Sequence, residues 1–404
     1  MPKWNDGYKH YHFIKMGYNI WNKWDPLEVC LLGNNYPPEF FDGLGTKAES
    51  PLKRICEETL EDLEGYKKIL QDFGVEVHQI PLPEQERFVD NPKRYPRGPL
   101  QPRDSGLVLG NKAYMVLGGP CIEETAFDEH PNIYQALNKY HTLENTRELA
   151  YPTIMTREEY DHIAGDYYPA YEDFCKHRLD RKYFLPQVWD ELVNRFRYTK
   201  DYIGSAHCFP LGTRLDCGYE GTHNIFTEEM LRERYDLEKF STINLLPLEG
   251  HTDGNYHPIK PGAILSLFDV QTYADTFPGW DVCYLPDQSF AKVRGFKKLK
   301  KKNKGKWWLA GEEDNDEFTY FVETWLQDWV GYVEETVFDV NVLVLDEHHV
   351  CVSNPNNEQV NTFLKKHNME PVYVPWRHRY FWDGGLHCIT LDLVRRGTQQ
   401  EYFK

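Results

Sequence analysis

Four side chains in this sequence could act together in nucleophilic chemistry, and each lies in or beside a turn. They belong to Asp104, His251, Asp253 and Cys388. Cys388 follows a Gly-Gly pair, and glycine permits both close backbone approach and a positive φ, which suits a ligand site. A thiol attacks carbon once its pKa is lowered, and a histidine beside it can take its proton and later protonate a leaving group. Taken alone, Cys388 also fits an ordinary buried cysteine of a strand.

The two carboxylates indicate what the thiol would attack. Asp253 lies two residues from His251, so on an extended segment both side chains would point to the same face. Carboxylates that share a pocket suit a guanidinium, because its planar fork binds carboxylates in a bidentate manner. With Asp104, they predict a Cys388 thiolate that attacks the central carbon of a bound guanidinium. Asp104 by itself also fits an ordinary turn residue or a helix cap.

The composition predicts a globular protein. The chain has 404 residues, of which 41% are hydrophobic and 27% charged, a length that suits one large domain or two to three ordinary ones. No run approaches the roughly 18 apolar residues of a membrane span, and residues 1–7 resemble neither a signal nor a transit peptide. The nine cysteines include no Cys-x-x-Cys pair, which favours reduced thiols in a cytoplasm over disulfides or a structural zinc site.

The charge balance argues against a nucleic-acid partner. The formal net charge is −17, and an acidic surface repels phosphates. One basic run, residues 297–306, lies close to the acidic run 312–317. We interpret the pair as an exposed loop of mutually compensating charges, and a docking site for an anionic partner is the alternative.

The elements that must position the four side chains alternate between strands and helices. Apolar runs predict strands over 27–32, 75–80, 243–248, 264–268, 371–375 and 385–394. Turn residues predict hairpins over 107–116, 206–217 and 340–352. Helical spacing and end signals predict helices over 53–73, 227–235 and 358–367. The hairpins argue against a purely parallel sheet and favour a single large mixed α/β domain. Residues 120–200 show only weak periodicity.

Five segments, in order along the chain, resemble the glycine (arginine:glycine) amidinotransferase family. They are residues 22–28, Pro102–Asp104, the turn 251–253 with Pro261-Gly262 after it, 341–347 and 384–398. The resemblance spreads over most of the chain and is closest from Val340 onward. It is weak over about 120–200 and 285–335.

The resemblance implies a fold. Members of this family are pentein α/β-propellers, with five ββαβ-type modules around a pseudo-fivefold axis and the active site in the central channel. We therefore expect one domain over residues 1–404, with divergent insertions at about 120–200 and 285–335. Relatives are often dimers, so a homodimer is an open possibility.

The resemblance also implies roles for the candidate residues. Cys388 would be the nucleophile that forms a covalent amidino-cysteine, and His251 the general acid and base. Asp104 and Asp253, with Arg103 beside them, would bind the L-arginine donor. An amine would then accept the amidino group, with no metal or organic cofactor. A hydrolase of the deiminase or dihydrolase type and a catalytically inactive binding module are the alternatives.

The sequence departs from the family pattern at the acidic partner of the histidine. Alignment places His207 where the family has an aspartate, and a shifted alignment would offer Asp201, Asp216 or Glu220 instead. Loss of a carboxylate would destabilise the protonated form of His251, because a nearby opposite charge favours the charged form. His207 either orients His251 by hydrogen bonding or is a structural histidine.

A second departure concerns the acceptor. The family's basic residue that holds the acceptor carboxylate aligns near Val270, and its serine pair aligns near Glu334 and Glu335. Loss of a cation and gain of carboxylates should disfavour glycine and favour a cationic or neutral amine. In the alternative interpretation, Glu334 and Glu335 simply face solvent.

Overall fold

The structure is a computed structural model of the chain. It describes residues 17–80, 82, 87–90, 99–104, 106–115, 149–150, 205–219, 228, 232, 237–247, 251–267, 276–285, 308–326, 329–330 and 335–403. The basic run 297–306 and nearly all of 120–200 lie outside these residues. Of the predicted helix over 227–235, only Glu228 and Arg232 are described, and both are helical.

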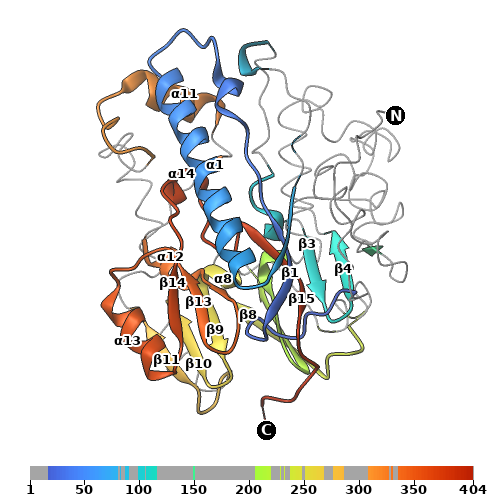
Figure 1. Cartoon of the computed structure of the whole chain (residues 1–404). Helices are drawn as coiled ribbons and strands as arrows, with labels where there is room; N and C mark the ends of the chain where they lie inside the picture. Colours follow the sequence, from blue (N-terminus) through green and yellow to red (C-terminus); the bar gives the residue numbers. More distant parts are fainter. Residues whose placement is uncertain are drawn as a thin grey trace, which may run out of the picture.

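The described strands form five separate three-stranded sheets (Figure 1). In space the strand orders are β15-β1-β2, β3-β4-β5, β6-β7-β8, β11-β10-β9 and β12-β13-β14. The strands are β1 (Leu27–Leu32), β2 (Glu76–Gln79), β3 (Gly106–Leu109), β4 (Lys112–Met115), β5 (Leu149–Ala150), β6 (Cys208–Leu211), β7 (Arg214–Tyr219), β8 (Thr242–Pro247), β9 (Tyr256–Lys260), β10 (Ala263–Ser266), β11 (Asp281–Tyr284), β12 (Leu343–Val344), β13 (His349–Val352), β14 (Glu370–Tyr373) and β15 (Thr390–Arg395).

Each sheet repeats one pairing pattern. Its central strand pairs antiparallel with one neighbour and parallel with the other. Parallel neighbours need a crossover, and in the part of the chain that the structure describes continuously, α1 (Glu49–Asp72) joins β1 to β2 and α13 (Glu358–Lys366) joins β13 to β14. The fold is therefore mixed α/β, and the prediction that hairpins exclude a purely parallel sheet is confirmed.

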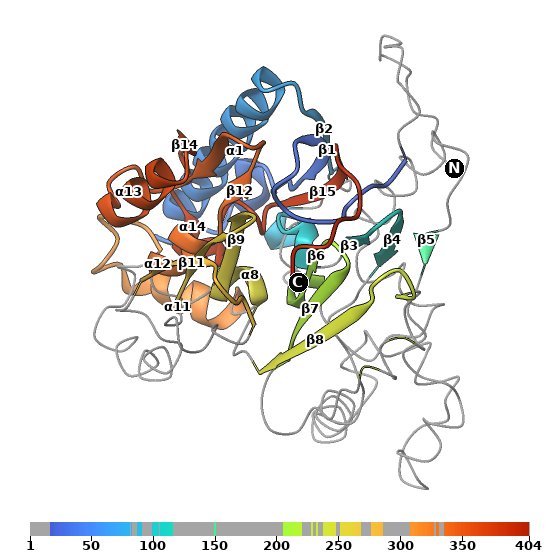
Figure 2. The same cartoon turned by 90° about the horizontal axis from the view of Figure 1, so that it is seen from below.

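The first and last of the described strands share a sheet. β15 pairs antiparallel with β1, and Figure 2 shows the two side by side. The remaining helices are α8 (Thr252–Asn255), α11 (Asp316–Trp325), α12 (Glu335–Val340) and α14 (Arg379–Trp382), with short 3₁₀ turns η1 (Pro38–Phe41), η2 (Phe88–Asp90), η3 (Pro102–Asp104) and η6 (Ser205–His207). The pairing of β15 with β1 brings the segment just before β15 to the ends of several elements from the first half of the chain.

Most predicted elements agree with the structure, and the differences lie at their boundaries. α1 begins four residues before the predicted start, since Pro51 falls in its first turn, where its missing N–H costs no hydrogen bond. The predicted hairpin over 340–352 is wrong at its start, because Val340 ends α12 and the strand is only Leu343–Val344. The predicted strand over 385–394 is likewise wrong at its start, since residues 386–389 form a turn.

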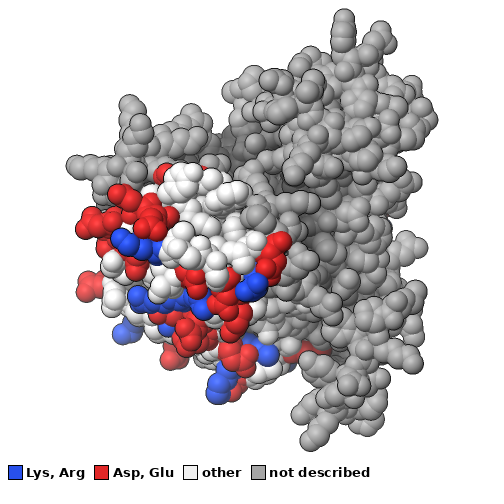
Figure 3. Space-filling view, turned by 90° about the horizontal axis from the view of Figure 1, so that it is seen from above, with Lys and Arg blue, Asp and Glu red and all other residues white. Residues whose placement is uncertain are grey.

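The core and the surface fit a globular fold. α1 buries a stripe at helical spacing that includes Leu52, Ile55 and Leu63. No described helix combines the length and apolar character needed to cross a membrane. The cysteines in the described residues are free thiols. On the described part of the face in Figure 3, Lys and Arg side chains lie among Asp and Glu side chains and form no separate basic area.

Candidate active site

Cys388 lies in the turn that leads into β15, and tight packing fixes that turn. A Cβ at Gly384 would lie 2.1 Å from Gln101 Nε2, and a Cβ at Gly385 would lie 2.6 Å from Asn341 Cβ. Neither glycine has a positive φ. Of the two properties that suit glycine to this position, the pair is therefore required for close approach. Cys388 itself is 6% exposed.

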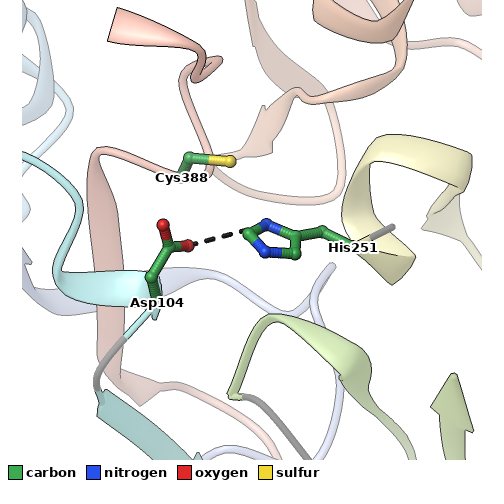
Figure 4. Close-up of side chains that lie close together, drawn as sticks. All are labelled: Asp104, His251 and Cys388. Carbon is green, nitrogen blue, oxygen red and sulfur yellow. Dashed lines mark ion pairs between the residues drawn. The ribbon is translucent and has the colours of Figure 1, made fainter. Parts of the chain in front are cut away.

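Asp104, His251 and Cys388 come together from three separate elements. Asp104 ends η3, His251 immediately precedes α8, and Cys388 precedes β15. One donor atom from each lies within 4.8 Å of those of the other two. Figure 4 shows the Asp104 carboxylate facing the imidazole, with 3.7 Å between Asp104 Oδ1 and His251 Nδ1. A thiol, an imidazole and a carboxylate thus share one small space.

The segment that holds His251 and Asp253 is not extended, so the expectation that both point to one face was wrong. Residues 252–255 form the helical turn α8, and the carbonyl of His251 accepts hydrogen bonds from Gly254 N and Asn255 Nδ2. The His251 side chain is 43% exposed, whereas that of Asp253 is fully buried. Both still border Cys388, because Asp253 Oδ2 lies 3.8 Å from its sulfur.

Asp253 is held by a buried imidazole and a buried guanidinium. Its Oδ2 lies 2.7 Å from His387 Nδ1 and 3.7 Å from Arg103 Nε. Arg103 Nε also approaches His387 Nδ1, at 3.3 Å. One nitrogen cannot donate to Asp253 and accept from Arg103 at once, and the shorter contact assigns the proton to Nδ1. Arg103, which also donates to the Cys208 carbonyl, therefore acts on Asp253 mainly through its charge.

Burial and neighbouring charges set the protonation states of the site. Burial alone would raise the pKa of Asp253, but Arg103 and the hydrogen bond from His387 outweigh it and hold that pKa well below its usual range. Burial lowers the pKa of His387 to about 4, against the opposing effect of Asp253. Burial raises the pKa of the Cys388 thiol well above its usual value, and the carboxylates of Asp253 and Asp104 add to the effect. At neutral pH the site thus holds a thiol, an ionised Asp253 and a neutral His387.

His207 lies beside His251, as the alignment predicts. Their rings meet edge to face, with centroids 5.4 Å apart and an interplanar angle of 78°. The hydroxyl of Thr252 in α8 donates to the His207 carbonyl, which ties the two segments together. Burial, followed by the charge of His251, lowers the pKa of His207 to about 3, so this imidazole is neutral at physiological pH.

The alternative acids differ in what the structure says of them. Asp216 makes paired hydrogen bonds with Arg214 at 2.6 and 2.8 Å and accepts from the Tyr256 hydroxyl, so its carboxylate is engaged away from His251. Asp201 and Glu220 lie outside the described residues. Of the described carboxylates, Asp104 is the one that forms an ion pair with His251.

Two carboxylate oxygens at the site are buried without a hydrogen-bond partner among the described residues. They are Asp104 Oδ1 and Asp253 Oδ1. A buried oxygen of this kind carries a desolvation cost that a ligand donor can relieve. Asp104, His251 and Cys388 are also donor types found around zinc, and they form the group among the described residues that could hold a cation.

Two residues of the site were missed at the level of sequence, namely Asn341 and His387. Asn341 is 2% exposed and hydrogen-bonds to the Cys388 sulfur, and His387 is 1% exposed and hydrogen-bonds to Asp253. Both lie in segments that resemble the family, which was the available signal. Of the predicted acceptor residues, Val270 and Glu334 lie outside the described residues, and Glu335 begins α12 with an undescribed side chain.

Comparison with known proteins gives a consistent result, although no family model matches the chain. A mitochondrial glycine amidinotransferase of Gallus gallus is 39% identical over 405 residues, which cover 95% of this chain and 84% of the relative. An L-arginine:L-lysine amidinotransferase of Pseudomonas savastanoi pv. phaseolicola is 23% identical over 153 residues, or 38% of this chain and 32% of the relative. The solved structure of SxtG, an amidinotransferase from Microseira wollei, aligns with a TM-score of 0.59 and 20% identity over 96% of this chain and 99% of that one, a likeness of fold.

Proposed function

The chain belongs to the glycine amidinotransferase family and is a transferase, and we propose that it moves an amidino group from L-arginine to an amine through a covalent adduct on Cys388. The observation that carries the proposal is the convergence of Asp104, His251 and Cys388 within 4.8 Å. A nucleophile and an acid/base group within reach of one carbon are the minimum for group transfer.

In this proposal the donor guanidinium lies between Asp104 and Asp253. Their Oδ1 atoms accept no hydrogen bond from the described residues, and a guanidinium offers five N–H donors. The charge of Arg103 keeps Asp253 ionised, so that the carboxylate can hold a cation. The central carbon of the donor would face the sulfur, which lies 3.8 Å from the Asp253 carboxylate.

Donor binding also gives a route to the thiolate. The free site raises the pKa of Cys388 through burial and through two carboxylates. A bound guanidinium offsets those negative charges, and a nearby positive charge favours ionisation of a thiol. The thiolate would therefore form when arginine is present, and a resting thiol would be spared other electrophiles.

The chemistry needs two transfers at the amidino carbon. The Cys388 sulfur gives its proton to His251 and forms a bond to that carbon. The bond from the carbon to the donor nitrogen breaks, and His251 protonates the leaving amine, which departs as ornithine. The acceptor amine then forms a new C–N bond and gives a proton to His251 as the C–S bond breaks. His251 returns that proton to the Cys388 sulfur, which restores the starting state.

We further propose that the acceptor is a cationic or neutral amine other than glycine. The support is the alignment of Glu334 and Glu335 with the acceptor site and the relative named for L-arginine and L-lysine, since lysine carries a second amino group. Turnover on lysine or a diamine should exceed turnover on glycine, and Glu335→Gln should lower it. Glycine as the best acceptor would contradict this part of the proposal.

Three broader features stay proposals. The five sheets of identical pairing pattern support five ββαβ-type modules around a pseudo-fivefold axis in one domain over residues 1–404, with insertions at about 120–200 and 285–335. The free described thiols support a reducing compartment such as the cytoplasm. Light scattering of the purified chain tests the homodimer.

The test of the proposed function is ornithine release from arginine with and without a panel of amines, with Cys388→Ser as the control. Ornithine that appears only when an amine is present supports transfer. Citrulline or urea formed without an amine would instead identify a hydrolase. Arginine binding without any product would identify the inactive binding module.

A further inference from the structure

Asn341 connects three parts of the site through all four of its side-chain hydrogen-bonding positions. It follows α12 and is buried. Its Oδ1 accepts from the backbone N–H groups of His387, at 3.0 Å, and Cys388, at 3.1 Å. Its Nδ2 donates to the Asp253 carbonyl and to the Cys388 sulfur, both at 3.2 Å.

The orientation of this amide is determined by its partners. Two backbone N–H groups can only donate, so the atom that faces them must be the oxygen. The nitrogen then faces a carbonyl and the sulfur, and each accepts a hydrogen bond from one of its two N–H groups. A flipped amide would place N–H against N–H twice. The donor to sulfur is therefore built in by the fold of the Cys388 turn.

Once the sulfur loses its own proton, the Asn341 amide stabilises it together with a backbone hydrogen bond from Gly385. As a thiol, Cys388 can donate to Asp253 Oδ2, 3.8 Å away. As a thiolate it loses that bond and faces the same carboxylate as a like charge. Among the described residues, Asn341 is the side chain that donates to the sulfur, and hydrogen bonds to charged acceptors are about twice as strong as neutral ones.

We propose that Asn341 is a catalytic residue, whose side-chain amide stabilises the Cys388 thiolate and holds it toward Asp104 and His251. The inference rests on the proposed function, since it concerns the nucleophile of that reaction. It also explains Gly385, because any side chain there would strike Asn341. The same amide holds the Cys388 turn in place and stabilises the negative charge of the thiolate, so one group both positions and activates the sulfur.

The experiment measures alkylation of Cys388 by iodoacetamide against pH, read by peptide mass spectrometry without arginine. Asn341→Asp keeps an acceptor for both backbone N–H groups but replaces the donor by a negative charge. We expect alkylation of Cys388 at pH 8 to slow at least about tenfold and the profile to move up by about one pH unit or more, since one unit changes the thiolate fraction tenfold. Asn361→Asp, the same change on α13 where Nδ2 contacts the Pro355 carbonyl, should leave the profile unchanged.

The outcomes separate the two proposals. An unchanged profile in a folded Asn341→Asp variant overturns the role of Asn341, whether or not arginine forms an adduct. A shifted alkylation profile in Asn341→Asp, together with no amidino adduct on Cys388 when the unsubstituted protein is incubated with arginine, supports the role of Asn341 and contradicts the proposed function. Should Asn341→Asp unfold, Asn341→Ala carries the same measurement, because it removes the donor without adding a charge. There too, an unchanged profile overturns the inference.

Discussion

The two sides of Cys388 differ in burial and in the strength of their contacts. The buried side consists of Arg103, Asp253, Asn341 and His387, each at most 2% exposed. Hydrogen bonds of 2.7 to 3.2 Å join Asp253, Asn341 and His387, and Arg103 Nε lies 3.7 Å from the Asp253 carboxylate. The open side consists of Asp104 and His251, whose side chains are 33% and 43% exposed and lie 3.7 Å apart. The difference supports the roles that we propose: the buried side fixes the nucleophile, and the open side meets substrates and moves protons.

The largest predicted effect on activity comes from the open side. His251→Asn should lower kcat by about 10²–10⁴-fold, because it removes the acid/base group. The free energy of unfolding should change by no more than about 0.5 kcal/mol, since the side chain is half exposed. Steady-state kinetics and urea denaturation of the variant check both numbers. A large loss of stability would show that the open side also supports the fold.

The buried side should respond in the opposite way. Arg103→Met removes one partner of a buried charge pair, which typically costs about 3–5 kcal/mol of unfolding free energy. Arg54→Met, which breaks the exposed pair with Glu58 in α1, should cost only about 0.3–0.5 kcal/mol. Denaturation of the two variants side by side gives the comparison. Equal losses would contradict the view that Arg103 compensates Asp253.

The pH dependence of stability sharpens the same contrast. The pKa values of His387 and His207 are lowered to about 4 and about 3 in the folded chain, below the usual 6.5, so the unfolded chain binds more protons. Stability should therefore be full above pH 6.5 and fall toward pH 4, by about 1.4 kcal/mol per pH unit for each proton. His207→Asn should reduce the slope by up to one proton in denaturation experiments from pH 4 to 7. An unchanged slope would show that His207 titrates normally.

The parts of this molecule that the sequence could predict are those with a local signature. β1 is an apolar run and matches its prediction residue for residue, and the Gly110 and Gly212 turns form at positive φ within the predicted hairpins. The grouping of Asp104, His251 and Cys388 was predicted from their residue types and turn positions and then from the resemblance, since no periodicity links residues so far apart in the chain.

The rest depends on contacts that no local pattern encodes. Asn341 is a single polar residue after a short helix, and its hydrogen bonds reach residues 46 and 47 positions away. His387 reads as part of a strand until its contact with Asp253, 134 residues earlier, is known. The helical turn α8 was missed because Asp-Gly in a four-residue segment favours a turn or a loop as readily as a helix.

The most direct test of the account is the intact mass of the protein after incubation with L-arginine, followed by peptide mapping. We predict a mass increase of one amidino group, located on Cys388, that disappears when an acceptor amine is added. The adduct should be absent from Cys388→Ser. A chain that binds arginine and gains no mass, or that carries the group on another residue, would contradict the proposal that Cys388 is the nucleophile.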